Sequence, residues 1–188
     1  MKKVLVITGN TGTGKTTVAN YLKRHYDIPQ VITHTTRVPR QGEVDGRDYY
    51  FETSETFQQL HLLEHVQYSQ AAYGSSYEGL ERAWRKAPVI SIVLDTAGAI
   101  AYQKALGSEA VILYLTVGKT DRLAERLLAR GDAPAKVQAR LNSAEYQRDL
   151  AIPIELTRHA YVIQNDDWSA TEQRLGAIIT EVITKQNE

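Results

Sequence analysis

The feature that constrains the fold most is a strand, a glycine-rich loop and a helix in direct succession near the start of the chain. Residues 4–7 form a short apolar run of the kind found in buried parallel strands. The sequence GNTGTGKT follows at positions 9–16, and apolar residues then recur on one helical face to about residue 25. A chain that begins in this way is expected to build a parallel sheet with its helices packed on the faces.

The loop itself matches the phosphate-binding pattern G-x-x-x-x-G-K-[ST] at all four fixed positions. Its glycines let successive backbone N–H groups turn toward phosphate oxygens, and the helix N-terminus adds a positive end. Lys15 would reach the outer phosphates of a nucleotide, and the Thr16 hydroxyl would bind a magnesium ion. A glycine-rich corner without a ligand is the weaker interpretation. The residues predicted to surround the phosphates are Gly9, Gly12, Thr13, Gly14, Lys15, Thr16 and Thr17.

Beyond the loop, strand-like and helix-like patterns continue to alternate. Apolar runs of strand length occur at 89–94, 111–115 and 160–164, and helical spacing follows at about 97–106, at about 120–129 and from about 169 onward. This alternation predicts the α/β class: a P-loop NTPase-type parallel sheet flanked by helices.

Two stretches depart from that alternation. Residues 33–80 are rich in Thr, Arg, Gly and Tyr, with strand-like pieces at 48–51 and 66–69 around a short helix near 54–63, which predicts an inserted small β-rich subdomain. Residues 122–148 are helical and dotted with arginine, and the sequence GDAP at 131–134 interrupts them. A helix, a Gly/Pro break and a second helix predict a mobile lid.

Composition excludes several other classes of protein. The 188 residues suffice for one compact domain with insertions, and 22 basic against 22 acidic residues argue against a generally basic nucleic-acid binder. The absence of cysteine excludes disulfides, thiolate zinc sites and thiol catalysis. Because no apolar run approaches the ~20 residues of a membrane span and the start is too short for a signal peptide, we expect a cytoplasmic protein with no membrane or nucleic-acid partner.

The inserted segment resembles the signature of the guanylate kinase family. The resemblance rests on THTTRVPRQGEVDGRDYYF at 33–51, on Glu64 followed by Tyr73-Gly74-Ser75, and on Asn165-Asp166-Asp167 after the last predicted strand. It implies that the insertion binds GMP, that ATP is the phosphoryl donor and that Mg²⁺ is required. The implied division is a core of 1–32, 81–125 and 150–188, a GMP-binding insertion of 33–80 and a lid of 126–149.

The resemblance also assigns roles to individual side chains. Arg37, Arg40, Tyr49 and Tyr73 match the residues that grip the GMP phosphate, and arginine suits this role because its planar fork donates two hydrogen bonds to one phosphate. Glu64, Ser75 and Thr33 match the residues that read guanine, whose ring N–H and amine face a carboxylate while its carbonyl faces a hydroxyl. An adenine would leave that carboxylate unpaired, and such a mismatch discriminates by as much as ~10⁴-fold.

In the lid, Arg126, Arg130 and Arg140 resemble arginines that neutralise the transferring phosphoryl group, and Arg126 and Arg140 are the two we favour. A solvated stripe of helical arginines is the alternative. Asn165 resembles a residue that contacts the donor adenine. No partner protein is implied, and the chain is expected to act as a monomer or a homodimer.

One departure from the family concerns the strand that ends at Asp95. Guanylate kinases usually carry two aspartates there, separated by one residue, whereas this chain has Val93 in the first position and Asp95 in the second. Asp95 is therefore predicted to serve the metal, the guanine or both.

The leading prediction is transfer of a phosphoryl group from ATP to GMP. A kinase with another acceptor, such as a ribose bisphosphate, is a second interpretation, but it leaves Glu64 and Ser75 without a purpose. A non-catalytic module that binds a nucleotide or a partner is the third. Val93 favours the module, and the complete loop with Lys15 and Thr16 argues against it.

Overall fold

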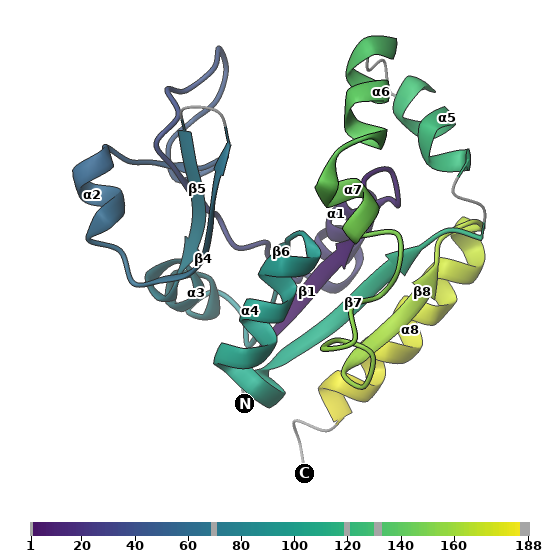
Figure 1. Cartoon of the computed structure of the whole chain (residues 1–188). Helices are drawn as coiled ribbons and strands as arrows, with labels where there is room; N and C mark the ends of the chain where they lie inside the picture. The colour runs from purple at the N-terminus through teal and green to yellow at the C-terminus, as the bar shows by residue number, and fades with distance from the viewer. Residues whose placement is uncertain (1, 69–70, 119–120, 130–132, 185–188) are drawn as a thin grey trace.

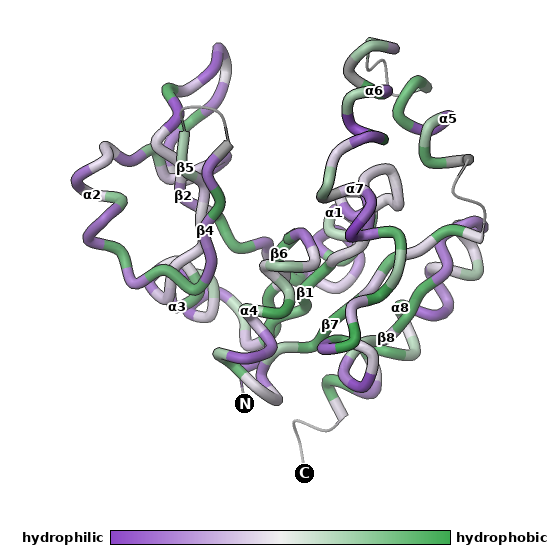
Figure 2. Tube along the Cα trace, in the orientation of Figure 1, coloured by the Kyte–Doolittle hydropathy of each residue, from purple (hydrophilic) through white to green (hydrophobic). Residues whose placement is uncertain are grey.

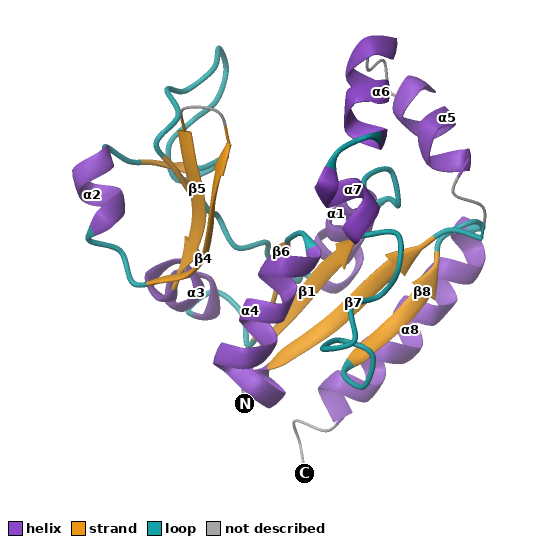
Figure 3. Cartoon of the chain, viewed as in Figure 1, coloured by secondary structure: helices purple, strands orange, loops and turns teal. Residues whose placement is uncertain are grey.

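The computed structural model describes residues 2–68, 71–118, 121–129 and 133–184. Two separate sheets organise them, a parallel one low in the view and a smaller one at the left, as Figure 3 shows. Figure 1 shows the smaller sheet and the helices α5 and α6 standing on opposite sides, with the strand β1 below and between them.

The parallel sheet has the order β6-β1-β7-β8, formed by β1 (Lys3–Gly9), β6 (Val89–Val93), β7 (Ala110–Thr116) and β8 (Ala160–Gln164). The central strand β1 is buried almost throughout. Because helices cover both faces of such a parallel sheet, the side chains on both faces of the strand are apolar. The strands β1 and β7 accordingly run through hydrophobic stretches in Figure 2. The parallel sheet predicted from the sequence is present.

Helices cover both faces of this sheet. The helix α1 (Lys15–Tyr26) packs with α8 (Trp168–Thr184) on one face, around a core that includes Leu5, Leu22 and Ile178. On the other face α3 (Tyr77–Trp84) and α4 (Thr96–Leu106) pack on a second core that includes Val6, Leu80 and Tyr102. A short 3-10 turn, η1 (Gly107–Glu109), links α4 to β7. Among the described residues, no helix has both the length and the apolar character to cross a membrane.

The smaller sheet has the order β3-β2-β5-β4. Its strands are β2 (His34–Thr35), β3 (Tyr50–Phe51), β4 (Leu62–Tyr68) and β5 (Ala71–Ser76), with the helix α2 (Ser54–Gln58) beside them. The predicted helix near 54–63 is therefore too long: it ends at Gln58, and Glu64 lies on a strand rather than at the end of a helix. The reason is that Leu62–Tyr68 forms ladder hydrogen bonds with the antiparallel strand β5. The local sequence pattern does not indicate this pairing.

A buried histidine joins this sheet to the next helix. His34 is fully buried and hydrogen-bonds through Nδ1 to Glu52 and through Nε2 to the Ser76 hydroxyl, each at 2.8 Å. Ser76 also caps α3 by accepting a hydrogen bond from the Gly79 backbone N–H. His34 thereby links β2, the chain after β3 and the start of α3, and it has a structural role.

The predicted lid region contains three helices: α5 (Asp121–Ala129), α6 (Pro134–Leu141) and α7 (Ala144–Arg148). Pro134 opens α6, a position at which its missing N–H costs nothing. The second predicted helix is thus two helices, α6 and α7. Arg130, one of the three arginines considered from sequence, lies outside the described residues.

Gly9 occupies a backbone position that only glycine fits. Its φ is 127°, and an added Cβ would overlap the backbone carbonyl oxygen of Leu115. We expect Gly9→Ala to lower the free energy of unfolding by at least about 2 kcal/mol, measured by urea denaturation. Gly42→Ala is the matched control, because Gly42 has a φ of 86° with open space around it, and it should cost about 1 kcal/mol. Equal losses in the two variants would mean that the contact with Leu115 carries no weight.

Candidate active site

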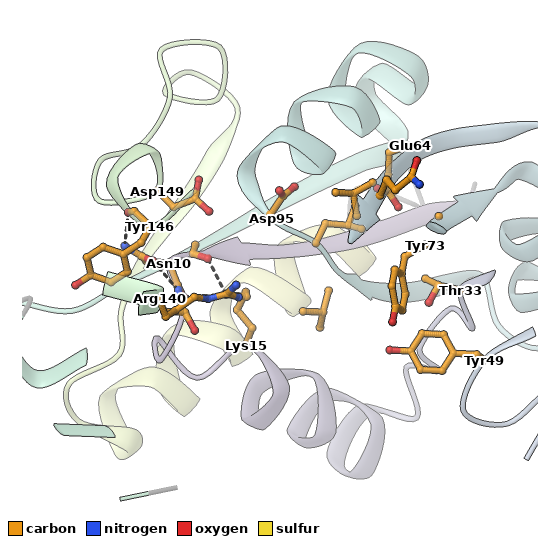
Figure 4. A pocket seen from close by; sticks show the side chains of 17 residues that line it. Asn10, Lys15, Thr33, Tyr49, Glu64, Tyr73, Asp95, Arg140, Tyr146 and Asp149 are labelled. Atoms are coloured by element: carbon orange, nitrogen blue, oxygen red, sulfur yellow. Dashed lines mark hydrogen bonds between the residues drawn. The ribbon is translucent and has the colours of Figure 1, made fainter. Parts of the chain in front are cut away.

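A cavity of about 590 Å³ opens where the loop after β1, the smaller sheet, the end of β6 and the lid helices meet. Figure 4 shows the side chains around it, with Lys15, Asn10 and Arg140 at one end and Tyr49, Tyr73 and Glu64 at the other. The size is typical of a pocket for a small molecule. The cavity therefore joins the loop to the inserted sheet, as the predicted site requires.

The loop presents an uncapped helix end to this cavity. Gly12 and Gly14 have φ values of 78° and 96°, and Gly14 is the N-cap of α1 without any side-chain capping hydrogen bond. The first backbone N–H groups of α1 thus keep their donor capacity for an anion. The Lys15 ammonium donates to the carbonyls of Gly9 (2.7 Å) and Asn10 (2.8 Å), which holds it against the loop.

Residues from distant parts of the chain hold the loop in place. The buried Asn165 donates from its amide nitrogen to the Thr13 carbonyl (2.8 Å), and its amide oxygen accepts from the Thr171 hydroxyl (2.9 Å). Arg126 donates to the Asn165 carbonyl at 2.8 Å and to the Gly12 carbonyl at 3.4 Å. Asn165 thus ties the loop to α8 through the two ends of its side chain, whereas contact with an adenine stays a prediction.

The smaller sheet lines the opposite end of the cavity with Thr33, Tyr49 and Tyr73. The rings of Tyr49 and Tyr73 lie 6.1 Å apart, edge to face. The Arg37 guanidinium lies 5.5 Å from the Tyr49 ring centre and donates two hydrogen bonds of 2.9 Å to the Glu43 carboxylate. Glu43 also accepts from the Arg40 backbone N–H, so one carboxylate organises the segment that carries both predicted phosphate-binding arginines.

Glu64 and Ser75 form a pair across two strands. They lie directly opposite each other in the β4–β5 register, so the fully buried Ser75 hydroxyl donates to Glu64 Oε1 at 2.9 Å. Burial raises the pKa of Glu64, the Ser75 hydrogen bond opposes this, and the negative charge of Asp95 raises it further. The site therefore holds a poorly solvated carboxyl group that would be stabilised by new donors from a ligand.

Asp95 stands at the end of β6 and caps α4, with Oδ1 accepting from the Gly98 N–H at 2.8 Å. Its other oxygen accepts from Arg148 at 3.0 Å. Val93 lines the cavity two residues earlier and offers no oxygen ligand. A second carboxylate comes instead from Asp149, which is buried beside the cavity and accepts hydrogen bonds from Arg148 and the Thr96 hydroxyl.

The structure brings eight of the predicted residues to the cavity wall and adds several others, whereas the described Arg37 and Arg40 do not line the cavity. Gly9, Lys15, Thr33, Tyr49, Glu64, Tyr73, Asp95 and Arg140 line the cavity; Ser75 reaches it through Glu64, and Arg126 contacts the loop. The cavity residues missed from sequence include Asn10, Tyr146 and Asp149. Asn10 donates to the Tyr146 carbonyl at 3.0 Å, tying the loop to α7. Asn10 occupies a variable position of the loop pattern, and the other two lie at the end of the predicted lid without any motif, so no sequence signal marked them.

A model of the guanylate kinase family matches residues 1–182 of the chain. The chain belongs to that family. Among curated guanylate kinases, one from Thermus thermophilus is 36% identical, over 77% of this chain and 68% of its own length. The one from Protochlamydia amoebophila is 32% identical, over 94% and 89%.

A solved structure supports the same assignment. The crystal structure of guanylate kinase from Anaplasma phagocytophilum aligns with 96% of this chain and 85% of its own, with a TM-score of 0.63 and 25% sequence identity. The family, fold class and enzyme class predicted from the sequence are confirmed. The boundaries of core, insertion and lid remain predictions.

Proposed function

We propose that this member of the guanylate kinase family transfers the terminal phosphoryl group of ATP to GMP, giving ADP and GDP. The observation that carries the proposal is one cavity that has a phosphate loop with Lys15 at one end and the Glu64–Ser75 pair at the other. The family and its curated members support this reaction. They favour neither a kinase with a different acceptor nor a module that only binds.

The acceptor phosphate is held from the side of the smaller sheet. Arg37, oriented by Glu43, and Arg40 neutralise it, while the hydroxyls of Tyr49 and Tyr73 donate to its oxygens. One of these oxygens attacks the γ-phosphorus of ATP in line, and the bond from that phosphorus to the β–γ bridging oxygen breaks as ADP departs. The attacking oxygen is already anionic, so the reaction requires no general base.

The charge that develops on the transferring phosphoryl group is stabilised from the other side of the cavity, by the loop and the lid. The backbone N–H groups at the start of α1 bind the phosphates of ATP, and Lys15 moves from the loop carbonyls to the transferring group. Arg126 and Arg140 approach from the lid. Positioned cations of this kind supply most of the catalysis in phosphoryl transfer, because little covalent chemistry falls to the protein.

Guanine is read by Glu64, Ser75 and Thr33. The Glu64 carboxylate accepts from the ring N–H and the exocyclic amine, and a hydroxyl donates to the carbonyl. Because Glu64 is desolvated, a base that offers no donors leaves it unpaired at a large cost. The same argument disfavours a ribose bisphosphate acceptor, which has no base.

The oxygen donors near the loop fit a magnesium ion that arrives with ATP. Thr16 in the first turn of α1 offers an exposed hydroxyl, and Asp95 offers a carboxylate at the end of β6. Among the described residues no cluster of three acidic or histidine ligands occurs, which suits a cation that takes most of its ligands from phosphates and water. When bound, the ion neutralises phosphate charge. The protein is further proposed to be cytoplasmic and to act as a monomer or homodimer.

The test is ADP release in the presence of ATP and Mg²⁺ with GMP, AMP, UMP or ribose 1,5-bisphosphate as acceptor. Turnover restricted to GMP is the expected result. Turnover with ribose 1,5-bisphosphate alone would replace the proposal by the second interpretation. GMP binding without turnover would favour the binding module, and Val93→Asp would then be examined for restored activity.

The raised pKa of Glu64 gives the reaction a characteristic pH dependence. Its carboxyl group stays protonated to a higher pH than an ordinary glutamate, and only the ionised form accepts both guanine donors. The KM for GMP is therefore expected to rise on acidification through this pKa, by up to about tenfold per pH unit, while the KM for ATP changes little. Glu64→Gln should lack this component and keep only the titration of the GMP phosphate. An equal pH response in both proteins would contradict the assignment.

A further inference from the structure

Arg148, the last residue of α7, bridges two carboxylates beside the cavity. Its Nη2 donates to Asp95 Oδ2 at 3.0 Å and to Asp149 Oδ2 at 3.2 Å, and its Nε donates to Asp149 Oδ1 at 2.7 Å. Asp149 is buried and also accepts from the Thr96 hydroxyl, so it is a fixed anchor for the guanidinium. Because Thr96 follows Asp95 directly in the chain, these contacts close into a ring at the start of α4.

The ring fixes the orientation of Asp95. One carboxylate oxygen accepts from the Gly98 backbone N–H at 2.8 Å, and the other accepts from Arg148. A carboxylate with a donor at each oxygen cannot turn, and each oxygen keeps a lone pair for a ligand. Among the described residues, those lining the cavity include Asp95 and Asp149 but not Arg148. Arg148 therefore acts on a ligand through Asp95.

Asp95 stands on the side of the cavity where Glu64 lies. The helix α4, which Asp95 caps, packs against β4, the strand that carries Glu64. In the view of Figure 4 Asp95 lies between Asp149 and Glu64. The edge of guanine next to its carbonyl has three N–H bonds, one on the ring and two on the exocyclic amine. Glu64 accepts two of them, so the second amine hydrogen requires another acceptor, and Asp95 supplies one.

We propose that Arg148 is a positioning residue for base recognition, holding Asp95 in the orientation that accepts the second amine hydrogen of guanine. The inference rests on the proposed function. Without the guanidinium, Asp95 keeps only its contact with Gly98, and its second oxygen is free to turn toward water. The phosphate loop lies at the other end of the cavity, so the rate of phosphoryl transfer in the bound complex is unaffected.

The test protein is the double variant Arg148→Met/Asp149→Asn. It removes one charge of each sign, so the net charge beside the cavity is kept and no buried carboxylate is left unpaired. The substrates are GMP and inosine monophosphate, which keeps the carbonyl and the ring N–H of guanine but lacks the amine. We expect kcat/KM for GMP to fall about five- to twentyfold through KM, with kcat within twofold. The value for inosine monophosphate should change less than twofold.

Three outcomes would overturn the proposal. They are unchanged kinetics with GMP, equal losses on the two nucleotides, and a raised KM for ATP with an unchanged KM for GMP. The last result would mean that the ring serves the phosphate end of the cavity. If the double variant does not fold, Arg148→Lys replaces it. A lysine still pairs with Asp149 but lacks the planar fork that also reaches Asp95, so a smaller loss confined to GMP is expected.

Two single variants are the controls. Asp149→Asn alone leaves Arg148 with an amide oxygen and Asp95 as acceptors, so the KM for GMP should stay within about threefold of the wild type. A loss as large as that of the double variant would assign the effect to Asp149 and overturn the proposal. Arg24→Met removes an arginine from the exposed last turn of α1 and should change neither nucleotide's kinetics.

Failure of the proposed function is distinguishable from failure of this inference. If the wild type phosphorylates no GMP, the proposed function fails. Calorimetric Kd values for GMP and inosine monophosphate then decide the role of Arg148 by the same criteria. A loss of affinity in the double variant that is confined to GMP would support it, and equal changes for the two nucleotides would overturn it.

Discussion

Replacing Lys15 with methionine is expected to lower kcat for GMP-dependent ADP formation by about 10²- to 10³-fold. The lysine opens α1 within the phosphate loop, and its ammonium already lies against the loop carbonyls that border the cavity. Methionine keeps the length of the side chain and removes the charge. Initial rates at saturating ATP and GMP measure the loss.

The control for this substitution is Lys23→Met, which removes the same charge from the exposed last turn of the same helix. It should leave kcat unchanged. The affinity for GMP, measured by calorimetry, should also survive in Lys15→Met, because Glu64, Tyr49 and Tyr73 at the far end of the cavity are intact. A folded Lys15→Met variant that keeps more than about a tenth of the wild-type rate would rule out the assigned role.

Glu64→Gln is expected to lower kcat/KM for GMP by about 10²- to 10³-fold. The glutamine amide places a donor against a guanine donor where the carboxylate offered two acceptors. The effect is large because the site is poorly solvated and water cannot replace the lost acceptor. Kinetics with GMP and AMP measure the loss and the accompanying fall in discrimination.

The free energy of unfolding shows whether Glu64→Gln affects guanine recognition alone or also the folding of the protein. The folded-state pKa of Glu64 lies above its unfolded value, so the ionised carboxylate is disfavoured by folding at neutral pH. Removing that charge should therefore not lower the free energy of unfolding at pH 7. Glu81→Gln is the matched control, because Glu81 pairs with Lys2 on the surface, away from the cavity. Unchanged GMP kinetics in Glu64→Gln would contradict the proposed reading of guanine.

The parallel sheet and the phosphate loop were predictable because their signals are local. Each buried strand is an apolar run, and the loop pattern specifies which backbone positions need glycine. The run at 160–164 coincides with β8, and that at 89–94 differs from β6 by one residue.

The inserted sheet was harder to predict because its strands depend on one another. Strand β4 is half exposed and shows no continuous apolar run, so the sequence predicts a helix near 54–63 in place of its first residues. The contacts that hold the loop were also hidden. Asn10 contacts Tyr146, and Asn165 contacts Thr13, across more than 130 residues of sequence, and such separations give no sign of contact.

That separation has a consequence for the order in which the protein is made. The loop at 9–16 is synthesised before the residues that hold its carbonyls and side chains, which are Arg126, Tyr146 and Asn165. The strand β1, which precedes the loop, likewise pairs with β6 and β7, and both of these strands come later in the sequence. The loop is thus synthesised well before it is complete, and a nascent chain acquires its full nucleotide site only after Asn165 has been added.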